Sequence, residues 1–282
     1  MLPGQASQTM IRTAMRRAEH QLLDHPRIFE DPIAVGLVPQ TDRQDILAAA
    51  DVLRGPIPSL LRLVFALRSK FAEDRLAQAA ARGARQYVMV GAGLDTFPWR
   101  QPEFAAGLQI FWIDHPASLE LSTGYFRECG LAVPRNVSFV AVDLEQQCLA
   151  EQMAECGFDC RVVTFCSALG VSQYLSRDTL EALLRFAASW PGESEIVCTF
   201  SPPDDALDGD DLAAARERMP ITAASGEPWQ TRLTVSEVFR LLASCGFAKA
   251  FHLTERCAQQ RYFPDGDMPR FPQLEQLFAA TV

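Results

Sequence analysis

The chain has 282 residues, enough for one large domain or two small ones around a sizeable buried core. Its composition, 48% hydrophobic and 22% charged, excludes a disordered chain and a disulfide-rich scaffold. With 26 Lys and Arg against 35 Asp and Glu, the formal net charge is −9, and no tract is dense in Lys or Arg. We therefore expect no nucleic-acid partner and no membrane partner.

The sequence shows no sign of export or membrane insertion. It contains no apolar run long enough to span a bilayer, and residues 1–20 lack the apolar segment of a secretory signal. None of the eight cysteines belongs to a Cys-x-x-Cys pair. We interpret them as small buried side chains in a reducing compartment, with no metal bound, and expect a cytoplasmic protein.

Residues 1–82 favour helices and contain no predicted strand. Apolar side chains recur at helical spacing over residues 11–25, and residues 60–81 form a long helical pattern that Gly83 would end. Between them, Asp31-Pro32 marks a turn or the start of another helix. We expect residues 1–82 to form a helical cap.

From residue 84 onward, short apolar runs alternate with helical patterns. The predicted strands cover residues 86–90, 109–114, 137–143, 161–166, 194–200 and 247–253. The predicted helices cover residues 116–129, 145–156, 177–189 and 234–245. The alternation predicts an α/β, Rossmann-like fold for residues 83–282, with a mostly parallel sheet and helices on both faces. The polar segment 202–232 is too long for a plain connection, so we expect an insertion over the active face.

Three strand ends predict a nucleoside site, because ligands of such sheets bind at the carboxyl ends of the strands. The first strand ends in Gly91-Ala92-Gly93, which allows a sharp turn and close backbone approach. Asp114 ends the second strand, where an acid accepts ribose hydroxyls, and Asp143 ends the third, where adenine lies. Either acid has an alternative role as a helix cap. Because no basic residue accompanies them to meet a pyrophosphate, the pattern favours S-adenosylmethionine, a cationic adenosine without phosphates.

Residues 85–96, RQYVMVGAGLDT, resemble the signature of the leucine carboxyl methyltransferase family, whose members are class I S-adenosylmethionine-dependent methyltransferases. The stretches RTAMRRAE, FEDPIA, ALRSKFAED, WIDHP, AVDLEQ and LGVSQYL are similar to further parts of that family. The resemblance covers nearly the whole chain. It implies that Arg68 grips the methionine carboxylate and that Asp143 and Leu144 hold the adenine.

Two positions depart from the family pattern. LGVSQYL has Leu169 where the family has Glu, and Phe97 follows GAGLDT where the family usually has Arg. The cofactor motifs are thus kept while two charged positions beside the site are lost.

Polar residues near the strand ends are the candidates for the chemistry. Tyr174 lies in the segment after the fourth strand, which faces the cofactor, and Ser201 ends the fifth strand. Asn136 precedes the third strand and reaches the site only if its loop folds over. We predict these three as catalytic, and Ser167, at the end of the fourth strand, as cofactor-binding.

Three functions stay open at this point. The first is O-methyl transfer to a carboxylate or hydroxyl of a small molecule of secondary metabolism, where alignment matters and a strong base is optional. The second is cyclisation of S-adenosylmethionine itself, whose α-amino group attacks its γ-carbon to give azetidine-2-carboxylate and methylthioadenosine. Such cyclases resemble this family, and the loss of a Glu at position 169 would favour the neutral amine. The third is a non-enzymatic binding protein, against which Gly91, Asp114 and Asp143 argue.

Overall fold

A sheet of seven strands lies at the centre of the computed structural model, which describes residues 8–264, 266 and 268–282. The strands are β1 (Gln86–Val90), β2 (Gln109–Asp114), β3 (Val137–Ala141), β4 (Thr164–Ala168), β5 (Glu195–Phe200), β6 (Lys249–His252) and β7 (Gln276–Thr281). Their order is β3-β2-β1-β4-β5-β7-β6, and β7 runs antiparallel to both of its neighbours. The predicted α/β fold with a mostly parallel sheet is confirmed.

The six predicted strands are present, with some ends displaced along the chain. The fourth strand, for example, begins at Thr164 rather than at residue 161. The seventh strand, β7, was not expected from the sequence. It follows α12 and runs antiparallel between β5 and β6, so it departs from the parallel βαβ pattern on which the sequence prediction rested.

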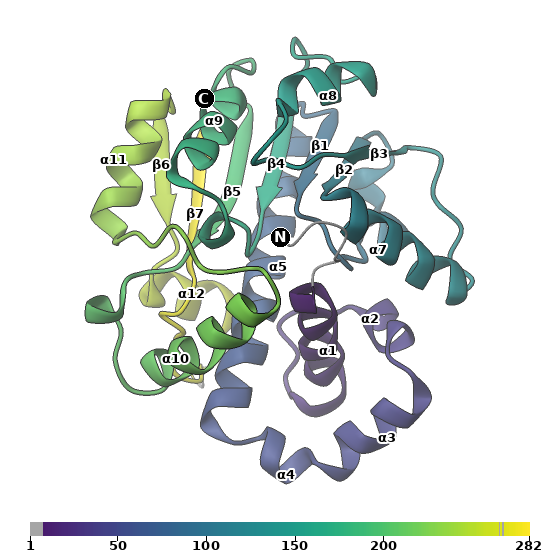
Figure 1. Ribbon diagram of the computed structural model, residues 1–282, viewed down its shortest axis with the longest axis vertical. Coiled ribbons are helices and arrows are strands. Elements are labelled where there is room, and N and C mark those ends of the chain that lie inside the picture. Colours follow the sequence, from purple (N-terminus) through teal and green to yellow (C-terminus); the bar gives the residue numbers. More distant parts are fainter. Residues whose placement is uncertain (1–7, 265, 267) are drawn as a thin grey trace.

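Helices cover both faces of the sheet (Figure 1). One face carries α8 (Leu149–Glu155), α9 (Arg177–Ala188) and α11 (Val235–Cys245), and the other carries α5 (Pro56–Arg82), α7 (Pro116–Glu128) and α12 (Glu255–Tyr262). Strand residues alternate between the two cores: Val88 and Val90 pack into the first, and Tyr87 and Met89 into the second. Double coverage explains why the strands are apolar throughout.

The N-terminal helices lie beyond the carboxyl ends of the parallel strands (Figure 1). They are α1 (Gln8–Leu23), α2 (Pro32–Leu37), α3 (Gln40–Ala48) and α4 (Ala50–Leu53). The Asp31-Pro32 pair starts a helix, since the Asp31 carboxylate accepts a hydrogen bond from the Ala34 N–H at 3.0 Å. Residues 1–7 of the predicted cap lie outside the described residues.

The 27-residue helix α5 connects this cap to the sheet. Its first half packs Leu61 and Phe65 against α10 (Gly209–Ala224). Its second half packs Phe71 and Leu76 under the sheet, and the helix ends at Gly83 as predicted. The hydrophobic packing is therefore continuous across residue 82, and the division into two domains there stays a prediction.

The segment 202–232 is built around helix α10 and a short turn, η3 (Asp204–Ala206). Its far end is tied to η2 (Ser172–Tyr174), because the Gln230 N–H donates to the Gln173 carbonyl at 2.7 Å. The remaining short helices, α6 (Phe97–Arg100) and η1 (Glu103–Ala105), connect β1 to β2. In the described part of the chain, every helix is too short or too polar to cross a bilayer.

Substitution of Phe71 by Ala tests the central place of α5. The Phe71 side chain is fully buried between α5 and the sheet, so its removal leaves a cavity and should lower the free energy of unfolding by about 3–5 kcal/mol. Urea unfolding measures this loss. The control, Phe104→Ala, removes a ring that is 36% exposed and should cost under about 1 kcal/mol. Equal losses in both variants would contradict the role given to α5.

Candidate functional site

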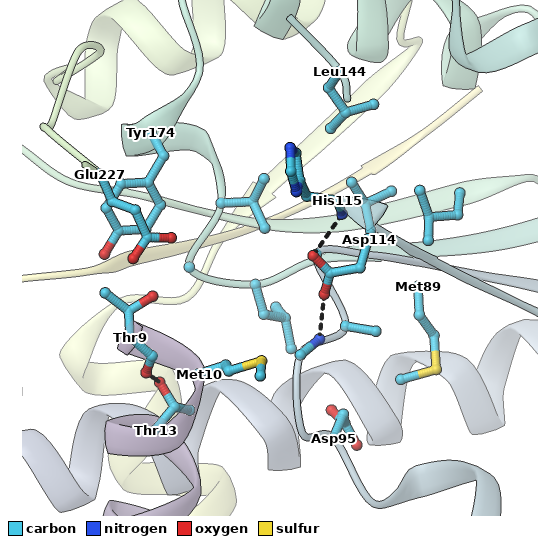
Figure 2. Close-up of a pocket in the computed structure, with 18 of the residues that line it drawn as sticks. Thr9, Met10, Thr13, Met89, Asp95, Asp114, His115, Leu144, Tyr174 and Glu227 are labelled. Carbon is cyan, nitrogen blue, oxygen red and sulfur yellow. Dashed lines mark hydrogen bonds between the residues drawn. The ribbon is translucent and has the colours of Figure 1, made fainter. Parts of the chain in front are cut away.

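A cavity opens at the carboxyl edge of the sheet, between the strand ends, α1 and the segment that follows α10 (Figure 2). The strand ends contribute Gly91 and Asp114, α1 contributes Met10 and Thr13, and the third wall contains Glu227. The cavity thus combines three parts of the chain that are far apart in sequence.

The turn after β1 needs its glycines. Gly91 and Gly93 have φ angles of +62° and +58°, in the left-handed region that side chains rarely adopt. A Cβ on Gly91 would also come within 2.4 Å of a Val171 methyl group, and one on Gly93 within 3.0 Å of the Met10 Cβ. Both glycines line the cavity, so the backbone is open to a ligand where the sequence predicted it.

Asp114 points into the cavity from the end of β2. Its Oδ2 accepts the Gly93 N–H at 2.7 Å, and its Oδ1 accepts the His115 N–H at 2.8 Å (Figure 2). His115, not Asp114, caps α7 through its Nδ1 and the Ala117 N–H. Asp114 therefore does not take the alternative role of a helix cap. A carboxylate offers about four acceptor positions, so two of them remain for ribose hydroxyls.

Burial raises the pKa of Asp114 to about 6, and the two backbone hydrogen bonds only partly oppose that shift. The negative charge of Glu227, on the opposite wall, raises the pKa further. Asp114 is therefore an acid poised near neutral pH, a property common at functional sites.

Asp143 and Leu144 line the neighbouring part of the cavity, as expected for an adenine site. The Asp143 carboxylate accepts the Glu145 N–H at 3.0 Å and lies 3.8 Å from the His115 Nε2. Asp143 therefore shapes the local turn, but it caps no helix, because α8 begins at Leu149 after Cys148. The capping alternative for Asp143 is wrong, and its ligand-binding role stays a prediction.

Arg68 lines the cavity beside Gly170, where an added Cβ would lie 2.6 Å from the arginine Nη1. The guanidinium pairs with Glu275 at 2.9 Å and stacks over the Phe65 ring, 4.4 Å from its centroid. Arg218 faces the same Glu275 at 3.9 Å. Two cations thus share one carboxylate, and of the two it is Arg68 that lines the cavity and can meet an anionic group of a ligand.

Ser167 and Tyr174 also line the cavity. The hydroxyl of Ser167, near the end of β4, lies 2.9 Å from the hydroxyl of Tyr87 on β1. Burial raises the pKa of Tyr174, so its hydroxyl stays protonated at neutral pH and can donate a hydrogen bond.

The structure does not bring the other two predicted catalytic residues to the cavity. Asn136 lies at the amino end of β3, the opposite edge of the sheet, where its side chain exchanges two hydrogen bonds with that of Gln101. Ser201 follows β5, but it is buried and does not line the cavity, and its carbonyl accepts the Leu233 N–H. Sequence order places a residue at a strand end without giving the direction of its side chain.

The two departures from the family pattern have different places. Leu169 lines the cavity, so an aliphatic side chain stands where the resemblance leads us to expect a carboxylate. Phe97 instead packs in the core, edge-on to Tyr87 with ring centroids 5.1 Å apart.

Sequence reasoning missed Glu227, whose side chain lies beside that of Tyr174 in Figure 2. Glu227 is 7% exposed, and its Oε2 has no hydrogen-bond partner among the described residues. The only signal was its position in segment 202–232, which we expected to cover the active face.

The cavity residues fit S-adenosylmethionine. Gly91 leaves space for close approach, Asp114 keeps two acceptor positions, and Arg68 supplies a cation. The unpaired oxygen of Glu227 can accept a hydrogen bond from a cationic or neutral donor of the ligand.

Comparison with known sequences agrees with this chemistry. A family model described as leucine carboxyl methyltransferase matches residues 10–188. YktD of Bacillus subtilis (strain 168), named as a candidate S-adenosyl-L-methionine-dependent methyltransferase, is 31% identical over 278 residues, which cover 90% of each chain. A Mycobacterium avium (strain 104) protein with a similar name is 30% identical over 215 residues, 74% of this chain and 67% of its own.

Solved structures share the fold. A candidate methyltransferase from Thermobifida fusca YX is 18% identical, with a TM-score of 0.56 over 94% of this chain and 93% of its own. A DUF574 family protein from Streptomyces avermitilis MA-4680 is 15% identical, with a TM-score of 0.55 over 94% of this chain and 96% of its own.

Removal of the Asp114 carboxylate tests its role in ribose binding. The Asp114→Ala variant should weaken binding of S-adenosylhomocysteine by about 1–3 kcal/mol, because ribose hydroxyls lose their buried acceptors. Titration calorimetry measures the dissociation constant. The control, Glu155→Ala, removes an exposed carboxylate at the end of α8 and should leave it unchanged. An Asp114→Ala affinity equal to the control would assign the aspartate a purely structural role.

The pKa of Asp114 predicts a pH dependence of the same binding. The ribose hydroxyls favour the ionised carboxylate, so affinity should be lost as the pH falls through about 6, by up to about tenfold per pH unit. Calorimetry between about pH 5 and about pH 8 measures it. A His115→Asn variant, which keeps a helix-capping side chain, should retain the dependence. Its disappearance in that variant would assign the titration to His115 instead.

Proposed function

Because the chain belongs to the leucine carboxyl methyltransferase family, it is an S-adenosylmethionine-dependent transferase, and we propose that it methylates a carboxylate or hydroxyl oxygen of a small molecule of secondary metabolism. The observation that carries this proposal is the extent of the cavity. Beyond the nucleoside-binding edge, it continues to a second polar end, lined by Thr13 of α1, Tyr174 of η2 and Gln230 after α10. That end supplies a place for an acceptor next to the amino-acid portion of the cofactor.

The residues of the chain act in this reaction by binding and alignment. When bound, S-adenosylmethionine supplies an electrophilic methyl group on a cationic sulfur. Asp114 and the turn at Gly91 hold the nucleoside, and Arg68 holds the carboxylate end. Tyr174, whose pKa burial raises further above neutral pH, is a protonated phenol that donates a hydrogen bond and orients the acceptor oxygen. Such alignment of reacting groups, with water excluded, is the main catalytic requirement of an in-line displacement.

The charge and the cysteines of the chain bear on its partners and its compartment. We propose a small-molecule acceptor and no nucleic-acid or membrane partner, which the net charge of −9 supports. A cytoplasmic location is supported by the eight cysteines, all of which are free thiols, three of them buried.

A second candidate function is the cyclisation of S-adenosylmethionine to azetidine-2-carboxylate and methylthioadenosine. Leu169 favours it, because this aliphatic side chain lines the cavity where the family has a carboxylate that would hold the amine protonated. Glu227 opposes it, because it returns a carboxylate to the same cavity from another wall.

The products formed from S-adenosylmethionine separate the two functions. Incubated with S-adenosylmethionine alone, the protein should leave it intact apart from slow background breakdown. Addition of a phenol or an aromatic carboxylate, tested as a series with phenol and benzoate as parents, should yield S-adenosylhomocysteine and the methylated oxygen compound. The Asp114→Ala variant is the control and should form little of either. Azetidine-2-carboxylate and methylthioadenosine released without an acceptor would contradict methyl transfer and establish the cyclase.

A further inference from the structure

Glu227 is held in the cavity wall by its backbone. Its N–H donates to the Thr222 carbonyl at 2.8 Å, and Gly226 before it has φ of +78°, which turns the chain at the end of α10. With 7% of the residue exposed, the side chain lies against the cavity and not in solvent. Its place is therefore a feature of the fold rather than one of many conformations of a surface side chain.

The other acids that line the cavity have hydrogen-bond partners. Asp95, Asp114, Asp143 and Glu145 each accept at least one backbone N–H, at 2.7–3.0 Å. Glu227 is the cavity-lining acid with a buried oxygen that no group in the described residues meets. A buried carboxylate oxygen without a hydrogen-bond partner is unfavourable, so Glu227 favours a hydrogen-donating or cationic group of a ligand in the cavity.

The surroundings of Tyr174 indicate the kind of ligand. The positive charge of Arg218 and the negative charges of Glu227 and Glu275 all act on its hydroxyl, so these groups lie near one another. Of them, Glu227 lines the cavity, together with Tyr174 and Arg68. Arg68 and Arg218 share the single carboxylate of Glu275, while the Glu227 Oε2 has no hydrogen-bond partner in the part of the chain that the structure describes. The cavity therefore presents the Arg68 cation and this unpaired carboxylate oxygen. An α-amino acid, with a carboxylate and an ammonium on one carbon, has the complementary pair.

Figure 2 shows that Glu227 and Tyr174 extend into the cavity from the side opposite Asp114. A ligand with its ribose on Asp114 thus has its amino-acid portion available to Glu227. We propose that Glu227 binds the α-ammonium group of S-adenosylmethionine, opposite Arg68, which takes the carboxylate. The inference rests on the cofactor use in the proposed function and adds a binding residue from segment 202–232.

This contact has a chemical consequence. A carboxylate that accepts a hydrogen bond from the ammonium stabilises its protonated form. A protonated amine has no free electron pair, so it does not attack the γ-carbon. Glu227 would thus protect the cofactor from cyclisation and leave its methyl group as the reactive centre.

Comparison of three nucleosides isolates the contribution of the ammonium group to the binding affinity. S-adenosylhomocysteine carries the ammonium and the carboxylate, 5′-(3-carboxypropylthio)-5′-deoxyadenosine lacks only the ammonium, and methylthioadenosine lacks both. The wild-type protein should bind the first more tightly than the second by roughly ten- to one-hundredfold, as expected for a charge-assisted hydrogen bond. Glu227→Gln should lose this preference, with affinities for the second and third nucleosides unchanged within about twofold. Calorimetry without any acceptor measures all three.

The control is Glu217→Gln, an exposed carboxylate on the neighbouring helix α10, which should bind all three nucleosides like the wild type. Two results would overturn the inference. These are equal wild-type affinities for the first two nucleosides, or an equal loss of affinity for both in Glu227→Gln. The wild-type comparison needs no variant, so it holds even if Glu227→Gln fails to fold. These binding measurements contain no acceptor, so they do not depend on methyl transfer. Failure of the proposed methyl transfer is therefore distinguished from failure of the Glu227 contact.

Discussion

The site depends on keeping the Asp114 carboxylate ionised at a buried edge of the sheet. Burial opposes ionisation and raises the pKa to about 6, while the N–H groups of Gly93 and His115 oppose the rise. The Gly93 N–H points at the carboxylate because the chain turns there with positive φ angles. A side chain on Gly91 would meet Val171, so the turn after β1 and the segment after β4 can approach each other only with glycine present.

The rest of the cavity follows from how distant segments are joined to this edge. The first half of helix α5 packs against α10, and its second half packs in the core under the sheet. Met10 of α1 lies against Gly93, and Gln230 hydrogen-bonds to the backbone of η2. The cap and the segment 202–232 are thus positioned by packing and backbone hydrogen bonds, and they bring Glu227 across from Asp114.

The parts that the sequence predicted well are those with a strong local cause. Apolar runs that end in Gly or Asp predicted the strands and the edge of the sheet at which the cavity opens, and Gly91, Gly93 and Asp114 line that cavity. Residues whose role depends on side-chain direction were harder to place. Asn136 bonds to Gln101 at the opposite edge, and Glu227 is brought in by the tertiary fold, which no local pattern encodes.

A bound cofactor should contact all three walls of the cavity: the strand ends, α1 and the segment after α10. Hydrogen–deuterium exchange of the backbone amides, with and without S-adenosylhomocysteine, tests it most directly. The account predicts that the ligand slows exchange in residues 91–95, in residues 9–17 and in residues 226–230. Slower exchange in residues 91–95 alone, with α1 and the segment after α10 unchanged, would contradict it.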